Sequence, residues 1–188
     1  MSIRDASLVG LGAAVISIAS PIAVPMPLGV PSTLQSFIIP LMGVLLGPRI
    51  GGLSALVYVL LGVVGLPVFA GGLSGPAVLL GPTGGFLASF PVMAFIAGFV
   101  PMPLPKAAGP RQHLTGWLHT WMLLTLAFCI NFLAGSLQFT FVTNSTASQA
   151  FAASVLPFLP SGLIKMAAVG IIGRKLARNV RRLAQGAY

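Results

Sequence analysis

The chain has 188 residues, of which 56% are hydrophobic and 6% are charged. A soluble globular domain carries about 25% charged residues, so this composition excludes a soluble globular protein. Ten Lys and Arg residues against one acidic residue would suggest nucleic-acid binding in a soluble protein, but here the cations follow a membrane topology. The sequence therefore predicts an all-α integral membrane protein with a single domain, residues 1–188, in the lipid bilayer and with no nucleic-acid partner.

A membrane-spanning helix needs about 20 apolar residues, which leaves room for six or seven spans. Breaks at Pro, Gly and charged residues predict six transmembrane helices, at about 8–24, 34–46, 50–68, 84–100, 117–139 and 151–172. The first segment follows a charged start, as a signal peptide does, but five more hydrophobic segments come after it. We therefore interpret it as a retained span.

The first predicted span carries a small residue at every fourth position, at Ala6, Gly10 and Ala14. Such a stripe is smooth and typically lets helices pack closely. It can face another helix of the same chain or a helix of a partner protein, and the pattern alone leaves both open.

The cations collect in alternate connections. Arg4 precedes the first span, Arg49 lies between the second and third, and Lys106 and Arg111 lie between the fourth and fifth. Five more follow the sixth span, whereas the connections after the first, third and fifth spans hold no Lys or Arg. Because cytoplasmic loops collect Lys and Arg, this distribution predicts that both termini are cytoplasmic and supports an even number of spans.

The connection GLPVFAGGLSGPAVLLGPTGG, residues 65–85, is long, uncharged and rich in Gly and Pro. Its backbone cannot face lipid, because unpaired N–H and C=O groups find no water there. We expect it to cover the bundle as a cap or to re-enter it. Repeated Gly lets backbone approach a ligand closely, so we favour a lid or binding-site role over a merely tight connection.

Lys165 is an ionisable residue inside the sixth predicted span, and the only acid in the chain is Asp5. A charge in a span is by default a sign of function. Its counterpart can be helix-end carbonyls, water or an anionic ligand such as a small-molecule carboxylate, and snorkelling to the interface is the alternative. The uncharged polar residues Gln35 and Asn131 also lie in or beside spans, where a hydrogen bond between helices is the simplest interpretation of each alone.

Residues 174–188 form a predicted basic amphipathic tail. Arg174, Arg178 and Arg181 share one helical face, and Leu176, Val180 and Leu183 share another. A helix that lies on anionic cytoplasmic lipid fits this pattern, and a docking surface for a partner is the alternative.

Several chemistries are absent from the sequence. No G-x-x-x-x-G-K-[ST] motif is present to hold ATP phosphates. One acid, two His residues and the single cysteine Cys129 provide no catalytic triad, no carboxylate pair and no metal cluster. We therefore expect no enzyme activity, no catalytic residue, no metal and no cofactor, and energy for any transport must come from elsewhere.

Three stretches of the chain look like motifs of one family. LGPRIGGLSALVYVLLGVVGLPVFAGG and GPTGGFLASFP, within residues 46–91, strongly resemble BioY, the biotin-specific S component of energy-coupling-factor (ECF) transporters. VPSTLQ at 30–35 resembles the family's VPxTxQ stretch, and LPFLPSGLIKM at 156–166 resembles its PFxPGDxxK element. The resemblance covers nearly the whole chain in order.

The resemblance implies an S-component fold of six transmembrane helices with cytoplasmic termini, in the cell (cytoplasmic) membrane. It implies biotin as the transported ligand, in a site toward the outer side that loops close. It also implies two kinds of protein partner, a transmembrane coupling protein and a pair of ATPase subunits that power biotin uptake. In S components a small-residue motif of the first helix meets the coupling protein, which makes Ala6, Gly10 and Ala14 the candidates for that contact.

The candidate substrate-binding residues lie in or near the resembling stretches and in the fifth span: Gln35, Gly81, Thr83, Gly84, Gly85, Phe86, Asn131, Ser161 and Lys165. The chain departs from the family pattern at Gly162, where Asp is usual, and at Phe86, where Tyr is usual. The Asp is expected to accept hydrogen bonds from the ureido N–H groups of biotin, and the hydroxyl of Ser161 could replace it. An S component for another small carboxylate vitamin, or a non-transport membrane protein that reuses the fold, are the alternative functions.

Overall fold

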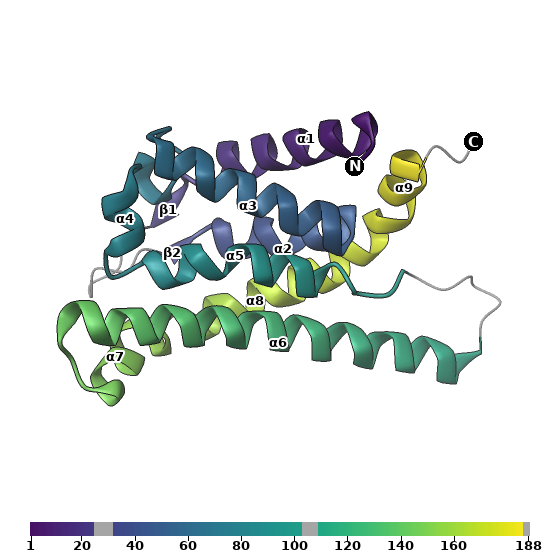
Figure 1. Ribbon diagram of the computed structural model, residues 1–188. Coiled ribbons are helices and arrows are strands. Elements are labelled where there is room, and N and C mark those ends of the chain that lie inside the picture. The colour runs from purple at the N-terminus through teal and green to yellow at the C-terminus, as the bar shows by residue number, and fades with distance from the viewer. Residues whose placement is uncertain (25–31, 103–108, 186–188) are drawn as a thin grey trace.

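The structure is a computed structural model that describes residues 1–24, 32–102 and 109–185 (Figure 1). It is built almost entirely of helices. Their bounds are α1 Ile3–Ala19, α2 Gln35–Leu46, α3 Pro48–Val64, α4 Pro76–Leu80, α5 Gly84–Ala97, α6 Pro110–Thr143, α7 Ala147–Ser154, α8 Leu159–Ala168 and α9 Arg174–Gln185. Two short 3₁₀ turns, Ala70–Gly72 and Leu156–Phe158, and a π-helical turn, Val169–Gly173, complete them.

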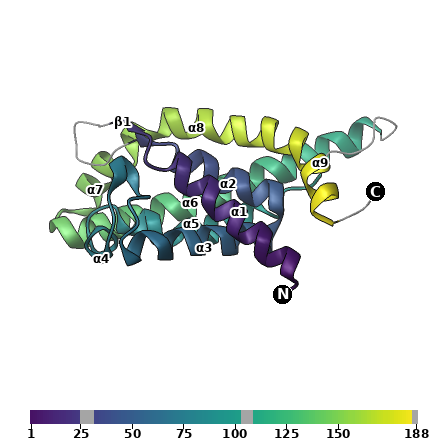
Figure 2. The same cartoon turned by 90° about the horizontal axis from the view of Figure 1, so that it is seen from above.

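The long helices run side by side as one bundle. α3 packs on α1 and α5, and α5 packs extensively on α6 and on α2. Figure 2 shows that α1 crosses obliquely over this layer. The N-terminus and the end of α9 lie at the same end of the bundle, while α4, α7 and the start of α2 lie at the opposite end (Figure 1). The two ends are called the terminal end and the cavity end below.

α1 begins five residues before the start of the predicted span 8–24 and ends five residues before the end of that span. Ser2 and Asp5 form a capping box at its start, which satisfies two backbone N–H groups. These hydrogen bonds with Ser2 hold the pKa of Asp5 below its usual value. Ser20 and Pro21 follow the helix, and Ala23–Val24 pairs antiparallel with Ser32–Thr33 as strands β1 and β2. The sequence pattern predicted helix to residue 24 and did not predict this short pairing.

The last predicted span, 151–172, is not one regular helix. α7 ends at Ser154, and a 3₁₀ turn that contains Pro157 connects it to α8. Proline lacks an N–H group and clashes with the preceding turn inside a helix, but it suits the first helical turn. The π-helical turn Val169–Gly173 then joins α8 directly to α9, with no loop between them.

Helix lengths differ widely. In the part of the chain that the structure describes, two helical stretches are long and apolar enough to cross a bilayer, Arg111–Thr143 and Ala147–Arg181, and α2, α3 and α5 are shorter apolar helices. α6 has 34 residues, about 51 Å at 1.5 Å per residue, which exceeds a hydrocarbon core of about 30 Å. α2 has 12 residues and is as short as the second hydrophobic segment predicts.

The helices pack closely where glycine removes a side chain. A Cβ atom on Gly43 of α2 would collide with the backbone carbonyl of Ala94 in α5, and one on Gly51 of α3 would collide with Gly43. The buried core around these contacts includes Ile39, Val44, Tyr58, Met93 and Leu124. Many large apolar side chains face outward instead, among them Leu11, Leu60, Phe99, Leu133 and Ile164, as expected of a bundle in lipid.

The arginines of α9 turn toward the bundle. Arg181 donates from Nη2 to the carbonyl oxygens of Val44 in α2, at 2.8 Å, and of Gly98 after α5, at 2.9 Å. The carbonyl ends of helices carry partial negative charge, so a guanidinium there is favourable. Arg174 is buried and Leu176 is exposed. Arg174 and Arg181 therefore pack against protein, whereas Lys175 is exposed, and the contact of this helix with lipid headgroups stays a prediction.

Candidate functional site

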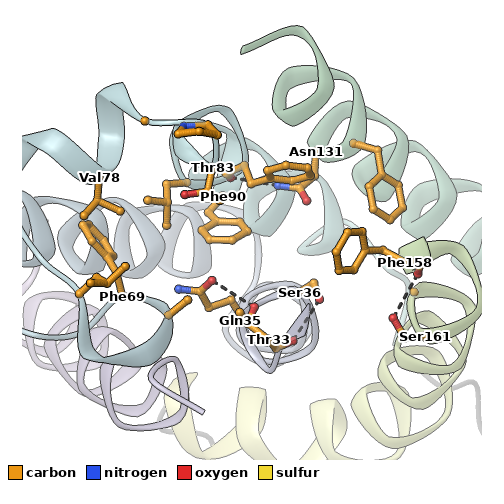
Figure 3. Close-up of a pocket in the computed structure, with 18 of the residues that line it drawn as sticks. Thr33, Gln35, Ser36, Phe69, Val78, Thr83, Phe90, Asn131, Phe158 and Ser161 are labelled. Carbon is orange, nitrogen blue, oxygen red and sulfur yellow. Dashed lines mark hydrogen bonds between the residues drawn. The ribbon is translucent and has the colours of Figure 1, made fainter. Parts of the chain in front are cut away.

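A cavity of about 390 Å³ lies at the cavity end of the bundle, between the start of α2, the 65–83 connection, α5, α6 and α8 (Figure 3). Its walls are mainly apolar, with residues Phe69, Ala70, Leu73, Ala77, Val78, Pro82, Phe86, Leu87, Phe90, Phe132 and Phe158. Polar side chains come from β2 and the start of α2, from the 65–83 connection, from α6 and from α8: Thr33, Gln35, Ser36, Thr83, Asn131, Ser161 and Lys165. Small ligands are usually bound by such apolar clefts with a few oriented polar groups.

The connection between α3 and α4 forms one wall of this cavity. It leaves α3 at Gly65, whose φ of 115° is left-handed, a conformation that glycine adopts without strain. Two backbone hydrogen bonds then hold it to the bundle, from Gly75 N–H to the Gly62 carbonyl at 2.7 Å and from Gly71 N–H to the Pro21 carbonyl at 3.1 Å. The Gly-rich segment covers the end of the bundle as an ordered cap.

A chain of hydrogen bonds connects the cap to the cavity floor. Thr33 Oγ1 donates to Gln35 Oε1 at 3.1 Å, and Gln35 Nε2 donates to the Tyr58 hydroxyl at 2.6 Å. The Tyr58 hydroxyl donates in turn to the Val68 carbonyl at 3.3 Å, and the Tyr58 ring packs edge-on against Phe69 with 5.8 Å between centroids. Gln35 is only 4% exposed, so these bonds orient a buried amide at the cavity.

Asn131 lies on α6 at the opposite wall (Figure 3). Its Nδ2 donates to the Phe86 carbonyl at 3.0 Å and to Ser89 Oγ at 2.8 Å. Ser89 donates its own hydroxyl proton to the Phe86 carbonyl, so both partners of Nδ2 are acceptors. The orientation of the amide is therefore fixed, and its oxygen Oδ1 is an acceptor on the side of the cavity.

Lys165 reaches from α8 to the start of α2. Its Nζ donates to the Thr33 carbonyl at 2.8 Å and to Ser36 Oγ at 3.2 Å. The sequence left open whether the Lys165 ammonium pairs with a carbonyl, with water or with an anionic ligand. The structure shows a bond to a backbone carbonyl. The ammonium also lies beside the first turn of α2, where a helix has N–H groups without intrahelical partners and partial positive charge.

Gly162 lines the cavity next to Ser161. A Cβ atom on Gly162 would lie 3.4 Å from the Phe132 ring, so a side chain at this position would extend into the cavity with little displacement of its neighbours. The Ser161 hydroxyl donates to the carbonyl of Phe158, in the turn just before α8, at 3.2 Å. Its oxygen can still accept a hydrogen bond from the cavity.

Seven of the nine residues expected from the sequence line the cavity, and two do not: Gly84 and Gly85. Both are buried at the start of α5, where a Cβ on Gly84 would collide with the Leu79 carbonyl and one on Gly85 with the Ala134 carbonyl of α6. These glycines allow close packing of backbone. Gln138 of α6 supports the same region, since its Nε2 donates to the carbonyls of Leu79 and Gly81 at 2.7 and 2.8 Å.

Sequence reasoning missed the aromatic lining. Phe69, Phe90 and Phe158 lie within the stretches that resemble the family and could have been included on that ground. Phe132 carried no such signal, because an apolar ring in a span faces lipid, core or cavity equally well. Among the described residues, no three of His, Cys, Asp and Glu come together in a way that could hold a metal ion.

Comparison with known proteins gives consistent results. A family model described as the BioY family matches residues 1–182. A probable biotin transporter BioY of Pyrococcus horikoshii is 36% identical over 179 residues, which cover 95% of this chain and 99% of that protein. The biotin transporter BioY of Rhodobacter capsulatus is 34% identical over 181 residues, or 93% and 94% of the two chains.

A solved structure has the same fold. It is the crystal structure of the S-component for biotin from an ECF-type ABC transporter, and it superposes with a TM-score of 0.77 at 26% sequence identity. The match covers 94% of this chain and 92% of that chain. The all-helical S-component fold that the sequence predicted is thereby confirmed.

Proposed function

This chain belongs to the BioY family, and we propose that it is a biotin-binding S component that mediates uptake of biotin across the cytoplasmic membrane. The observation that carries this proposal is the convergence of the three resembling stretches on one cavity. The start of α2, the cap with the start of α5, and α8 are far apart in the sequence, and each contributes side chains to the same space.

The cavity suits the chemistry of biotin. Biotin has a largely apolar body, a ureido ring and one carboxylate. The aromatic and aliphatic walls from the cap, α5, α6 and α8 would enclose the apolar body, and the few polar groups would orient the two ends.

The carboxylate would bind beside Lys165. The ammonium there is close to the N-terminal end of α2, so a carboxylate would meet a full positive charge and the positive end of a helix together. The Ser36 hydroxyl accepts from Nζ at 3.2 Å and donates its proton to the Thr33 carbonyl, so it helps to hold the ammonium in place. A hydrogen bond to a charged group contributes about 1.5–3 kcal/mol.

The ureido N–H groups would meet neutral acceptors. Gly162 offers no side chain at the position where the family usually has Asp, and the fixed Oδ1 of Asn131 and the Ser161 hydroxyl oxygen are the acceptors in the cavity wall. Neutral acceptors form weaker hydrogen bonds than a carboxylate. The proposal therefore includes a weaker ureido contact than an Asp at position 162 would give.

We place the chain in the cytoplasmic membrane as a multi-pass protein with six spans and both termini cytoplasmic. The alternating cations support this orientation, and the common location of the N-terminus and the end of α9 is consistent with it (Figure 1). The cavity then opens toward the outer side of the membrane, where biotin arrives.

The power for transport would come from separate subunits, a transmembrane coupling protein and ATPases. The contact surface would be the stripe of Ala6, Gly10 and Ala14. All three are exposed on α1, and a Cβ on Gly10 would meet no atom within 4 Å among the described residues. A neighbouring face of α1 packs inward through Val9, Ala13 and Ile16, and the stripe itself stays exposed and available to a partner.

Two assays test the function. Purified protein should bind radiolabelled biotin saturably at one site per chain, with competition by unlabelled biotin. No binding, together with binding of another small carboxylate, would support the alternative S component, which the Gly162 departure favours. Uptake of labelled biotin into cells that carry the coupling module, and its loss when the ATPases are inactivated, separates a transporter subunit from a protein that reuses the fold.

A further inference from the structure

Gln138, on α6, holds the far end of the Gly-rich cap from outside the cavity. Its Nε2 donates to the carbonyl oxygens of Leu79, in the last turn of α4, at 2.7 Å and of Gly81, just after α4, at 2.8 Å. Gly81 lines the cavity, and Gln138 is not part of that lining. The amide therefore acts on the site through the position of α4.

Apolar packing does little to fix α4. The helix has five residues and none of them is buried, so it removes little apolar surface from its surroundings. The start of the cap differs, because Val68 and Phe69 are buried in the core. Segments with few buried contacts are the ones that open locally at the lowest cost in free energy. The position of α4 therefore depends on its hydrogen bonds to the bundle.

Gly75 provides a hinge at the start of α4. Its φ of 90° lies in the region that favours glycine, and its N–H group donates to the Gly62 carbonyl at 2.7 Å. This bond keeps the start of α4 attached to α3. When the bonds of Gln138 break, the end of α4 can swing about Gly75, since hinges are terminal residues that absorb a change in φ and ψ. The swing carries Ala77 and Val78 of the cavity wall with it.

The start of α5 leaves room for the Gln138 amide. A Cβ on Gly84 would collide with Gln138 Nε2 as well as with the Leu79 carbonyl, and one on Gly85 would lie 3.0 Å from the Gln138 Cβ. A side chain at either glycine would displace the amide from its two acceptors. The two glycines of the GPTGG stretch therefore permit the contact between α6 and the end of α4.

We propose that Gln138 is a positioning residue whose two hydrogen bonds hold α4 over the cavity and thereby set the rate at which ligand enters and leaves. Because Gln138 is not part of the cavity lining, a ligand does not take part in these bonds. Their loss then favours the open position of α4 equally with and without ligand. Entry and release should become faster by the same factor, and the dissociation constant should change little. The ligand rates rest on the proposed function, whereas the motion of α4 does not.

The first experiment measures the association and dissociation rates of labelled biotin with purified protein in detergent. Gln138→Met keeps the length of the side chain and removes the donor. It should raise both rates about tenfold, as the loss of two neutral hydrogen bonds implies, and should leave the dissociation constant within about threefold of wild type. Gln112→Met is the matched control on the same helix, because Gln112 is exposed at the terminal end, and it should keep both rates.

Gln138→Glu adds a pH profile that loss of packing would not give. An ionised carboxylate repels the two carbonyl oxygens, whereas the protonated acid can donate to one of them. The biotin rates of this variant should therefore fall toward those of wild type between about pH 8 and pH 5.5, as the introduced carboxyl gains its proton. Residues 65–100 and 130–154, which include α4, α5 and α7, hold no other titratable side chain. Gln138→Met, measured at each pH, corrects for titration elsewhere.

The second experiment needs no ligand. Val78 lines the cavity from α4 and is partly buried, so a thiol reagent should reach Val78→Cys mainly when α4 opens. In a Cys129→Ala background, adding Gln138→Met should speed the labelling of Val78→Cys about tenfold, and adding Gln112→Met should not. Faster labelling supports the role of Gln138 even if wild type binds no biotin, which would refute the proposed function alone.

Circular dichroism and monodisperse elution verify that each variant folds, and Gln138→Glu at low pH carries the test if Gln138→Met does not fold. Two results would overturn the proposal. One is unchanged labelling of Val78→Cys after the loss of the Gln138 amide. The other is a weaker equilibrium affinity for biotin with an unchanged association rate, which would mean that Gln138 only supports the shape of the cavity.

Discussion

The Nζ atom of Lys165 lies 2.8 Å from the carbonyl oxygen of Thr33, a residue 132 positions earlier in the chain. This bond joins α8 to the start of α2 at the cavity end of the bundle. It brings the polar residues of two separate sequence stretches, VPSTLQ and LPFLPSGLIKM, into one site.

Gly162→Asp should tighten biotin binding. The new side chain would enter the cavity beside the Phe132 ring, 3.4 Å from the added Cβ, and would present a charged acceptor to the ureido N–H groups. A charge-assisted bond in place of a neutral one predicts about a tenfold lower dissociation constant, measured by equilibrium binding of labelled biotin. Gly162→Asn is the control of similar shape without the charge, and it should show a smaller gain. Equal or weaker binding by Gly162→Asp would mean that the ureido ring lies elsewhere.

Tyr58→Phe should loosen the cap and lower stability. The change leaves Gln35 Nε2 without its acceptor at a buried position, and an unpaired buried donor costs about 1–3 kcal/mol. The thermal midpoint in detergent should fall, and biotin should bind less tightly because the Val68 carbonyl of the cap loses its hydrogen bond to Tyr58. The double variant Gln35→Leu/Tyr58→Phe removes both partners and should recover part of the thermal stability but not the binding. A double variant less stable than the sum of the single changes would contradict this account.

Gly10→Trp or Ala14→Trp should spare biotin binding and weaken assembly with the coupling protein, because bulk on the smooth face of α1 prevents a close helix contact. Co-purification with a tagged coupling protein measures assembly. Leu11→Trp is the matched control, since Leu11 is exposed on α1 outside the stripe. If the Gly10 variant assembles normally but loses biotin binding, the stripe does not face the partner.

Single cysteines in a Cys129→Ala background test the six-span topology. Ser74→Cys and Ser145→Cys, at the cavity end, should react with a membrane-impermeant thiol reagent added outside the cell. Lys106→Cys and Gln185→Cys should react only after the membrane is permeabilised; Lys106 lies outside the described residues, and position 185 ends α9. External labelling at position 185 would refute a cytoplasmic C-terminus.

The parts of the fold that charge and backbone chemistry determine could be predicted from the sequence. Pro, Gly and charged residues marked the helix breaks near α2, α3 and α5 within a few residues, and Lys165 stood out because its span holds no acid. The Gly-rich connection was expected to cap the bundle or to re-enter it, because its backbone could not face lipid.

The other features of the site depend on which way each side chain of a helix faces, and an almost wholly apolar sequence does not show this. In a water-soluble helix the polar face marks the outside, whereas here the outward Leu133 and the cavity-lining Phe132 are both apolar neighbours on α6. The roles of Gly84 and Gly85 in packing, and the inward turn of Arg181, likewise depend on partners from distant helices. Sequence spacing within one helix does not show such partners.

The account depends most directly on the contact between Lys165 and a ligand carboxylate. The measurement is the affinity of wild type and of Lys165→Met for biotin and for biotin amide, four dissociation constants that form a cycle. Wild type should bind the amide about tenfold or more weakly than the acid, as the loss of one charge-assisted hydrogen bond implies. In Lys165→Met the difference between the two ligands should nearly vanish. Equal binding of acid and amide by wild type would contradict the account, because Lys165 would then serve only to hold α8 to Thr33 and Ser36.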